Sequence, residues 1–126
     1  MNHSEQQSIH ESCDGDAADG PQTACDLRVA FDGNRGRAIS FTCDGREIRA
    51  YEGETVAAAL MAHGQRSLRT TSRESQPRGI FCNMGICFDC LVEIDGRPNL
   101  RACQSFVVQG MRVRTQYGVG EWELPT

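Results

Sequence analysis

The chain lacks several features, and each absence narrows its class. It contains no lysine, so all 13 basic side chains are arginines. No apolar run approaches the roughly 20 residues of a membrane-spanning helix, and no transmembrane segment is expected. The first residues lack the basic and apolar regions of a secretory signal, which predicts a cytoplasmic protein. The chain has no GxGxxG fingerprint and should bind no dinucleotide itself, and no nucleic-acid partner is expected.

Charge divides the chain unevenly. The formal net charge is −4, yet residues 1–26 hold six acids and no arginine, whereas the remainder holds 13 arginines against 11 acids. A segment so acidic and so poor in large apolar residues cannot bury enough surface to fold alone. We therefore expect a disordered leader over 1–36, a folded domain over 37–116 and a C-terminal tail over 117–126. Ordering of the leader on a partner subunit is the open alternative.

Local patterns predict strands and one helix in the folded domain. Apolar residues alternate from Ile39 to Cys43 before an Asp44-Gly45 turn signal, so 38–51 should form a β-hairpin.

Thr55 is a typical N-cap, and Gly64 a typical stop, for a short helix between them. The order of elements favours an α+β fold, a mixed sheet with one packed helix. Further extended segments are expected at 67–71, 91–94, 100–108 and 111–115.

Four of the seven cysteines are spaced C-x4-C-x2-C-x12-C. The first three match the run that holds a plant-type [2Fe–2S] cluster, and a later cysteine completes the set. The predicted cluster and metal ligands are Cys82, Cys87, Cys90 and Cys103.

By analogy of spacing, Cys82 and Cys87 should share one iron, and Cys90 and Cys103 the other. Of the remaining cysteines, Cys13 and Cys25 are expected to be free thiols in the leader, and Cys43 a small buried or half-buried apolar residue.

The cluster loop is expected to turn its backbone amides towards the sulfur atoms. Gly79 and Gly85 can take conformations barred to residues with a Cβ. Apolar side chains should screen the cluster from water, namely those of Phe81, Met84, Ile86, Phe88 and Leu91.

A four-cysteine zinc site, forming a zinc-stabilised interaction module, is the main alternative chemistry. Structural zinc sites usually pair two short cysteine knuckles, which this spacing does not do. A Rieske centre is excluded because it needs two histidine ligands, and the three histidines lie far from the loop. The chain contains no residue predicted to be catalytic.

With these motifs in view, the chain resembles the small [2Fe–2S] subunits of bacterial flavin-dependent amino- and imino-acid dehydrogenases. This family includes hydroxyproline dehydrogenases, opine oxidases and hydrogen cyanide synthase. The segments that carry the resemblance are 53–56, 81–98, 101–104 and 110–113.

The resemblance implies a β-grasp ferredoxin-like fold and an electron-transfer role within an oxidoreductase complex. FAD is then expected on partner dehydrogenase subunits. Electrons would pass to an acceptor such as a quinone, which the complex would reach by peripheral contact, without a transmembrane segment. The resemblance favours a complex that oxidises hydroxyproline or an opine. The small subunit of hydrogen cyanide synthase and a freestanding ferredoxin are the alternative functions. An arginine-rich surface is either a docking site for an acidic partner or a solvated face, formed by Arg66, Arg69, Arg73, Arg78, Arg97 and Arg101.

Overall fold

The predicted hairpin forms one edge of the main sheet. In the computed structural model, which describes residues 26–29 and 32–121, β1 (Ala38–Cys43) pairs antiparallel with β2 (Arg46–Tyr51). Asp44 and Gly45 have φ angles of 50° and 82°, the positive values that a tight hairpin turn requires. The hairpin expected over 38–51 is therefore confirmed.

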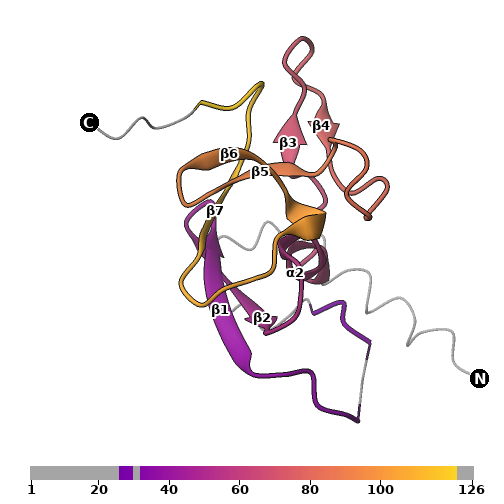
Figure 1. Ribbon diagram of the computed structural model, residues 1–126, viewed down its shortest axis with the longest axis vertical. Coiled ribbons are helices and arrows are strands. Elements are labelled where there is room, and N and C mark those ends of the chain that lie inside the picture. The colour runs from indigo at the N-terminus through magenta and orange to yellow at the C-terminus, as the bar shows by residue number, and fades with distance from the viewer. Residues whose placement is uncertain (1–25, 30–31, 122–126) are drawn as a thin grey trace, which may run out of the picture.

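Five strands form a mixed sheet in the order β2-β1-β7-β5-β6 (Figure 1). Strand β5 (Leu91–Ile94) pairs antiparallel with both β6 (Arg97–Arg101) and β7 (Arg112–Thr115). Strands β1 and β7 run parallel at the centre of the sheet. This sheet and the helix packed on it confirm the predicted α+β ferredoxin-like fold.

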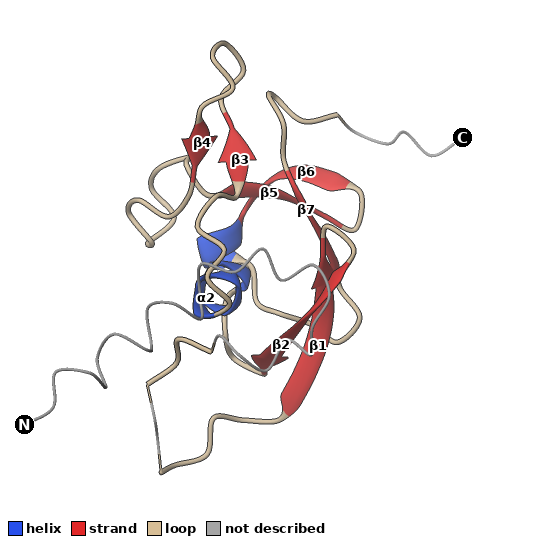
Figure 2. Cartoon of the chain, turned by 180° about the vertical axis from the view of Figure 1, so that it is seen from behind, coloured by secondary structure: helices blue, strands red, loops and turns tan. Residues whose placement is uncertain are grey.

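The helix α2 (Val56–Ala62) begins and ends where the sequence predicts. Thr55 Oγ1 accepts a hydrogen bond from the Ala58 N–H at 3.1 Å, and Gly64 takes a φ of 80° after the last turn. Seven residues are too few for a stable isolated helix, so packing on the sheet must hold it (Figure 2). Within the described residues, no helix has the length and apolar character needed to cross a bilayer.

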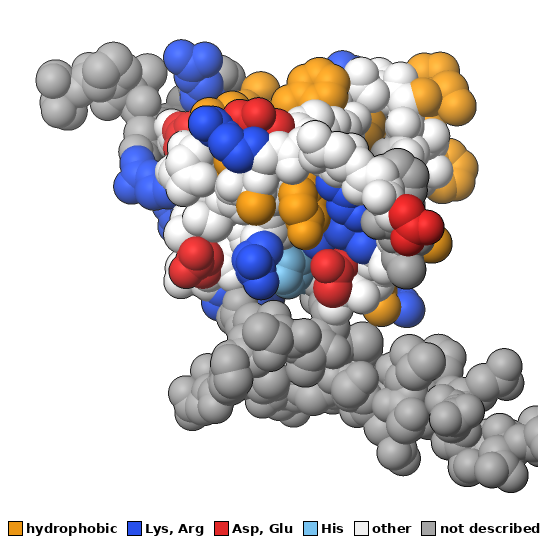
Figure 3. Space-filling view, turned by 90° about the horizontal axis from the view of Figure 1, so that it is seen from below, with side chains coloured by type: hydrophobic (Ala, Val, Ile, Leu, Met, Phe, Trp, Pro, Cys, Tyr) orange, Lys and Arg blue, Asp and Glu red, His pale blue; other side chains and the backbone are white. Residues whose placement is uncertain are grey.

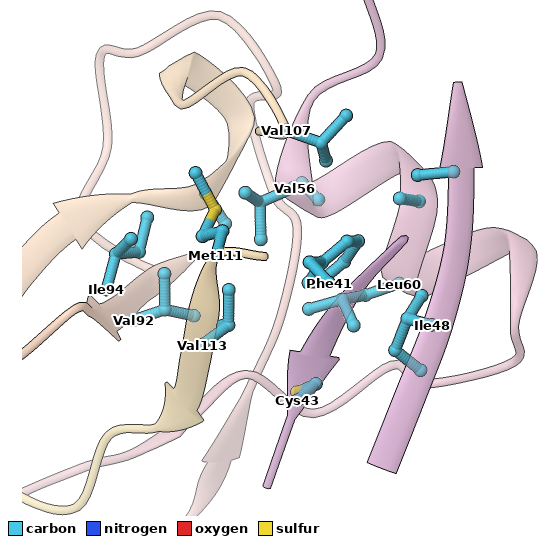
Figure 4. Packing of buried hydrophobic residues seen from close by; sticks show 14 of the residues in the cluster. Phe41, Cys43, Ile48, Val56, Leu60, Val92, Ile94, Val107, Met111 and Val113 are labelled. Atoms are coloured by element: carbon cyan, nitrogen blue, oxygen red, sulfur yellow. The ribbon is translucent and has the colours of Figure 1, made fainter. Parts of the chain in front are cut away.

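The core lies between the helix and the sheet (Figure 4). Phe41, Val56 and Leu60 are almost completely buried there, and each such burial stabilises the fold by roughly 1.5–3 kcal/mol. Cys43 is fully buried among them, as predicted, and burial raises the pKa of its thiol to about 11. This cysteine therefore packs as an apolar residue.

Two local features differ from the sequence prediction. The edge strand expected within 67–71 is present as β3 (Arg69–Thr70), but it pairs with a strand that was not predicted, β4 (Pro77–Arg78). The extended segment expected over 100–108 is interrupted by the 3-10 turn η1 (Ala102–Gln104). The Ala102 N–H donates to the Cys90 carbonyl oxygen at 3.0 Å, and this tertiary contact curls the chain around Cys103.

Residues 26–29, which fall within the predicted leader, contact the folded domain. The Leu27 N–H donates to the last carbonyl oxygen of α2 at 2.8 Å. Arg28 Nε and Nη2 donate to the two carboxylate oxygens of Glu54 at 2.7 and 2.8 Å, and the guanidinium lies 5.3 Å from the Tyr51 ring centroid. This segment is thus attached to the helix end and the sheet edge, while residues 1–25, with Cys13 and Cys25, lie outside the described residues.

The half-buried Arg28–Glu54 pair predicts that the stability of the fold decreases in acid. Burial alone would raise the pKa of Glu54, but hydrogen bonds from Arg28 and from the Tyr51 N–H outweigh it and lower that pKa. A carboxylate with a lowered folded pKa stabilises the fold above its unfolded pKa, about 4.3, and this contribution is lost as the pH falls through the folded value. We expect Glu54→Gln to reduce the free energy of unfolding at pH 7 by about 2 kcal/mol, measured by urea titration.

The difference in the free energy of unfolding between Glu54→Gln and wild type should become smaller as the pH falls below about 4.3. Glu52→Gln is the matched control, because Glu52 forms an exposed ion pair with Arg37 that should contribute little. A gap that stays constant across this pH range would contradict the assigned pKa shift.

Candidate iron–sulfur site

The four predicted ligands lie in two segments that pack against each other. The loop between β4 and β5 carries Cys82 and Cys87, both half-buried, and ends at the buried Cys90. The buried Cys103 lies in η1, directly after β6. The antiparallel pairing of β5 with β6 brings η1 alongside the end of the loop.

Backbone amides converge on the sulfur of Cys82. The N–H groups of Cys87 and Met84 each donate to Cys82 Sγ at 3.4 Å. These two hydrogen bonds, with a contribution from the Cys87 side chain, lower the pKa of the Cys82 thiol to about 6. The lowered pKa favours the thiolate form of Cys82, which is the form that binds metal.

Cys90 and Cys103 make the second pair of neighbouring thiols. Burial raises the pKa of Cys90, and the adjacent Cys103 side chain acts in the same direction. Gln104 Nε2 lies 3.7 Å from Cys103 Sγ and can donate to it. The raised pKa disfavours the thiolate form of Cys90 in the absence of a metal.

The predicted glycines serve two different purposes. Gly85 has a φ of 81°, and a Cβ added there would lie 2.9 Å from the Gln104 side chain. Gly79 does not have a positive φ, but a Cβ there would lie 2.0 Å from the Arg66 carbonyl oxygen. Conformation explains the first glycine, as predicted, whereas space alone explains the second.

The apolar side chains of the loop lie at the surface and do not cover the thiols. Leu91 alone among the five residues expected to screen the cluster is buried. The amides of Met84 and Cys87 turn inwards to Cys82 Sγ, so the side chains between them turn outwards. Figure 3 shows hydrophobic groups among charged ones on one face of the molecule. The exposed fractions are 79% for Phe81, 64% for Met84, 72% for Ile86 and 62% for Phe88.

The four cysteines form two neighbouring thiol pairs, which is the set of protein ligands that a two-iron cluster takes. No three His, Cys, Asp or Glu side chains among the described residues are grouped around one metal-ion position. A [2Fe–2S] cluster requires no such group, because each iron takes two protein thiolates. The structure supplies two thiol pairs, Cys82 with Cys87 and Cys90 with Cys103, with amides aimed at sulfur.

A family model described as a 2Fe-2S iron-sulfur cluster binding domain matches residues 36–118. The chain belongs to this family. The match spans the whole main sheet, the helix and all four cysteines, so the [2Fe–2S] cofactor predicted from the spacing is confirmed.

The chain is also similar to parts of several named enzymes. Hydrogen cyanide synthase subunit HcnA of Pseudomonas aeruginosa is 49% identical over 73 residues, covering 58% of this chain and 69% of HcnA. Sarcosine oxidase subunit alpha of Corynebacterium sp. (strain P-1) is 44% identical over 48 residues, covering 38% of this chain and 5% of that subunit. The crystal structure of L-proline dehydrogenase from P. horikoshii matches with a TM-score of 0.60 and 28% identity, covering 74% of this chain and 18% of that one.

These relatives confirm the resemblance drawn from the motifs, and with it the class of function, an electron-transferring [2Fe–2S] subunit of an oxidoreductase. The chain corresponds to only a small part of the sarcosine oxidase and proline dehydrogenase chains.

Two contacts at the site were not predicted. Arg101 Nε donates to the Cys87 carbonyl oxygen, and Gln104 Nε2 lies near Cys103 Sγ. Arg101 was recognised only as a surface arginine and as part of a motif. Its position two residues before Cys103 is the signal that could have placed it at the site.

Proposed function

We propose that Cys82, Cys87, Cys90 and Cys103 hold the [2Fe–2S] cluster and that the chain relays electrons from the FAD of a partner dehydrogenase subunit to an acceptor. The observation that carries the ligand assignment is the formation of two thiol pairs, one in the loop and one between the loop end and η1. The pairs correspond to the iron sharing expected from the spacing. The bound cluster would supply one-electron oxidation and reduction.

The chain's own residues set the surroundings of that chemistry. The amides of Met84 and Cys87 stabilise negative charge at Cys82. Cys90 and Cys103 are buried, whereas Cys82 and Cys87 are half-buried beneath the loop surface. Electrons therefore have their shortest path to a partner on the Cys82–Cys87 side.

The loop surface supports a role within a complex. Four large apolar side chains are exposed within eight consecutive residues, Phe81, Met84, Ile86 and Phe88. Contact with a partner would bury them and exclude water from the half-buried thiols. Such a contact also brings the Cys82–Cys87 pair close to the partner's flavin, as electron transfer requires.

The resemblance supports an amino- or imino-acid dehydrogenase of the hydroxyproline or opine type as the complex. A cytoplasmic location and a quinone acceptor, reached through a peripheral link, complete this proposal. The domain limits proposed are a leader over 1–36, a cluster domain over 37–116 and a tail over 117–126.

A second candidate is the small subunit of a hydrogen cyanide synthase. It is favoured by the 49% identity to HcnA, of which the chain covers 69%. The two candidates differ in substrate and product, not in the role of this chain.

Isolation of the native complex tests the proposal. The affinity-tagged full chain should co-purify with FAD-containing subunits and carry two irons and two sulfides per chain. The complex should then reduce a dye acceptor with hydroxyproline, proline, octopine or nopaline as the substrate. Release of cyanide from glycine would instead support the second candidate.

Two results would contradict the proposed role. A flavin-free monomer carrying the cluster would favour a freestanding ferredoxin. Colourless protein with stoichiometric zinc would favour the zinc-stabilised module.

A further inference from the structure

Arg101 connects the two segments that carry the cysteines. It ends β6, two residues before Cys103, and is half-buried. Its Nε donates to the carbonyl oxygen of Cys87 at 3.2 Å. Its guanidinium carbon lies 4.6 Å from the centroid of the Phe88 ring. One side chain from the Cys103 segment thus holds two consecutive residues of the loop.

This contact acts together with the other links between the segments. Arg101 is paired with Leu91 in the β5–β6 register, and the next residue donates its N–H to the Cys90 carbonyl oxygen at 3.0 Å. The planar guanidinium suits this place, because it can donate a hydrogen bond while stacking on an aromatic face. The orientation of the loop at Cys87 therefore depends on Arg101.

Arg101 also places a positive charge next to Cys87, one of the proposed ligands, because its Nε lies 3.2 Å from the Cys87 carbonyl oxygen. Within the described part of the chain, no carboxylate forms an ion pair with it. Arg78, another arginine that contacts the loop, lies 3.9 Å from Asp89, which partly offsets its charge. A cluster held by four thiolates is anionic and becomes more so on reduction, so a nearby cation favours the reduced state.

We infer that Arg101 is a positioning residue that fixes the cluster loop and raises the reduction potential of the bound cluster. The inference rests on the proposed four-cysteine site, but not on the identity of the partner or the substrate. It assigns to this arginine a role in setting how readily the chain accepts an electron.

The test compares three variants of the full chain, purified anaerobically. Arg101→Gln removes the charge, Arg101→Lys keeps it, and Arg97→Gln removes an equal charge from the exposed start of the same strand. The midpoint potential is measured by redox titration followed by EPR. Loss of visible absorption in the presence of an iron chelator measures how firmly the loop holds the cluster.

We expect the midpoint potential of Arg101→Gln to fall below those of wild type and Arg97→Gln, and that of Arg101→Lys to stay close to wild type. Cluster loss to the chelator should be about 10- to 100-fold faster in Arg101→Gln, the usual effect of removing a group that orients a metal ligand. Equal potentials for Arg101→Gln and Arg97→Gln would overturn the inference.

If Arg101→Gln retains no iron, the midpoint potential of Arg101→Lys tests the inference instead. A potential close to wild type in Arg101→Lys supports the inference, whereas a lowered potential overturns it. A wild-type chain without a [2Fe–2S] spectrum would refute the four-cysteine site itself, and the inference with it.

Discussion

Replacement of Cys103 by alanine is expected to abolish the visible absorption of the cluster and the EPR signal of its reduced form. The physical reason is that this residue is the proposed fourth ligand, and Cys90, its neighbour, would be left as the single thiol on its side of the site. Metal analysis should show loss of nearly all iron and sulfide from the purified full chain. Retention of both at wild-type levels would rule out Cys103 as a ligand.

Cys43→Ala is the matched control for this experiment. Cys43 is also a buried, free cysteine, but it lies in β1 and contacts Gln65 and Asp44. Its replacement should leave iron and sulfide content unchanged and cost about 1 kcal/mol of stability, because it removes one small buried group. Loss of the cluster in both variants would indicate general misfolding.

Replacement of Gly79 by alanine is expected to have the second-largest effect. A Cβ at this position would lie 2.0 Å from the carbonyl oxygen of Arg66, and a backbone atom cannot move aside as the end of a side chain can. The contact would push the entrance of the cluster loop away from the segment that follows α2. We expect a loss of about 3 kcal/mol in the free energy of unfolding, measured by urea titration, together with weaker retention of iron.

Gly110→Ala separates this steric effect from the cost of backbone conformation. Gly110 has a φ of 79° and no atom within 4 Å of an added Cβ. Its replacement should cost only about 1 kcal/mol, the strain of a left-handed residue. If Gly79→Ala were no more destabilising than Gly110→Ala, the close approach to Arg66 would not be the reason for the glycine.

Features determined by neighbouring residues were predictable from the sequence. The turn at Asp44-Gly45 needs positive φ angles, and the cap at Thr55 needs only a side-chain oxygen beside the first helical turn. The cysteine spacing likewise predicted the cofactor, because it places three thiols within one short loop.

Features determined by distant residues were not predictable in the same way. The turn around Cys103 depends on a hydrogen bond to the Cys90 carbonyl oxygen, and β4 exists only because it pairs with β3. The ion pair between Arg28 and Glu54 joins residues 26 positions apart. Neither periodicity nor spacing contains information about such contacts.

The orientation of the loop side chains shows the same limit within the site. Apolar residues such as Phe81 and Ile86 predict burial, and the sequence alone suggests that they cover the cluster. In the structure the thiols and amides occupy the inner side of the loop, so these side chains are left outside. A partner surface, absent from the sequence of this chain, is what could bury them.

Because the side chains of the loop face outwards, the proposed subunit leaves the cluster site uncovered on the Cys82–Cys87 side. Water and dioxygen can approach the half-buried Cys82 and Cys87 as long as the loop is uncovered. A partner seated on Phe81, Met84, Ile86 and Phe88 would shield this side at the moment it forms the electron path. Association with the partner would then also protect the cluster from oxidative damage. The order in which the subunits associate would therefore matter as much as the affinity between them.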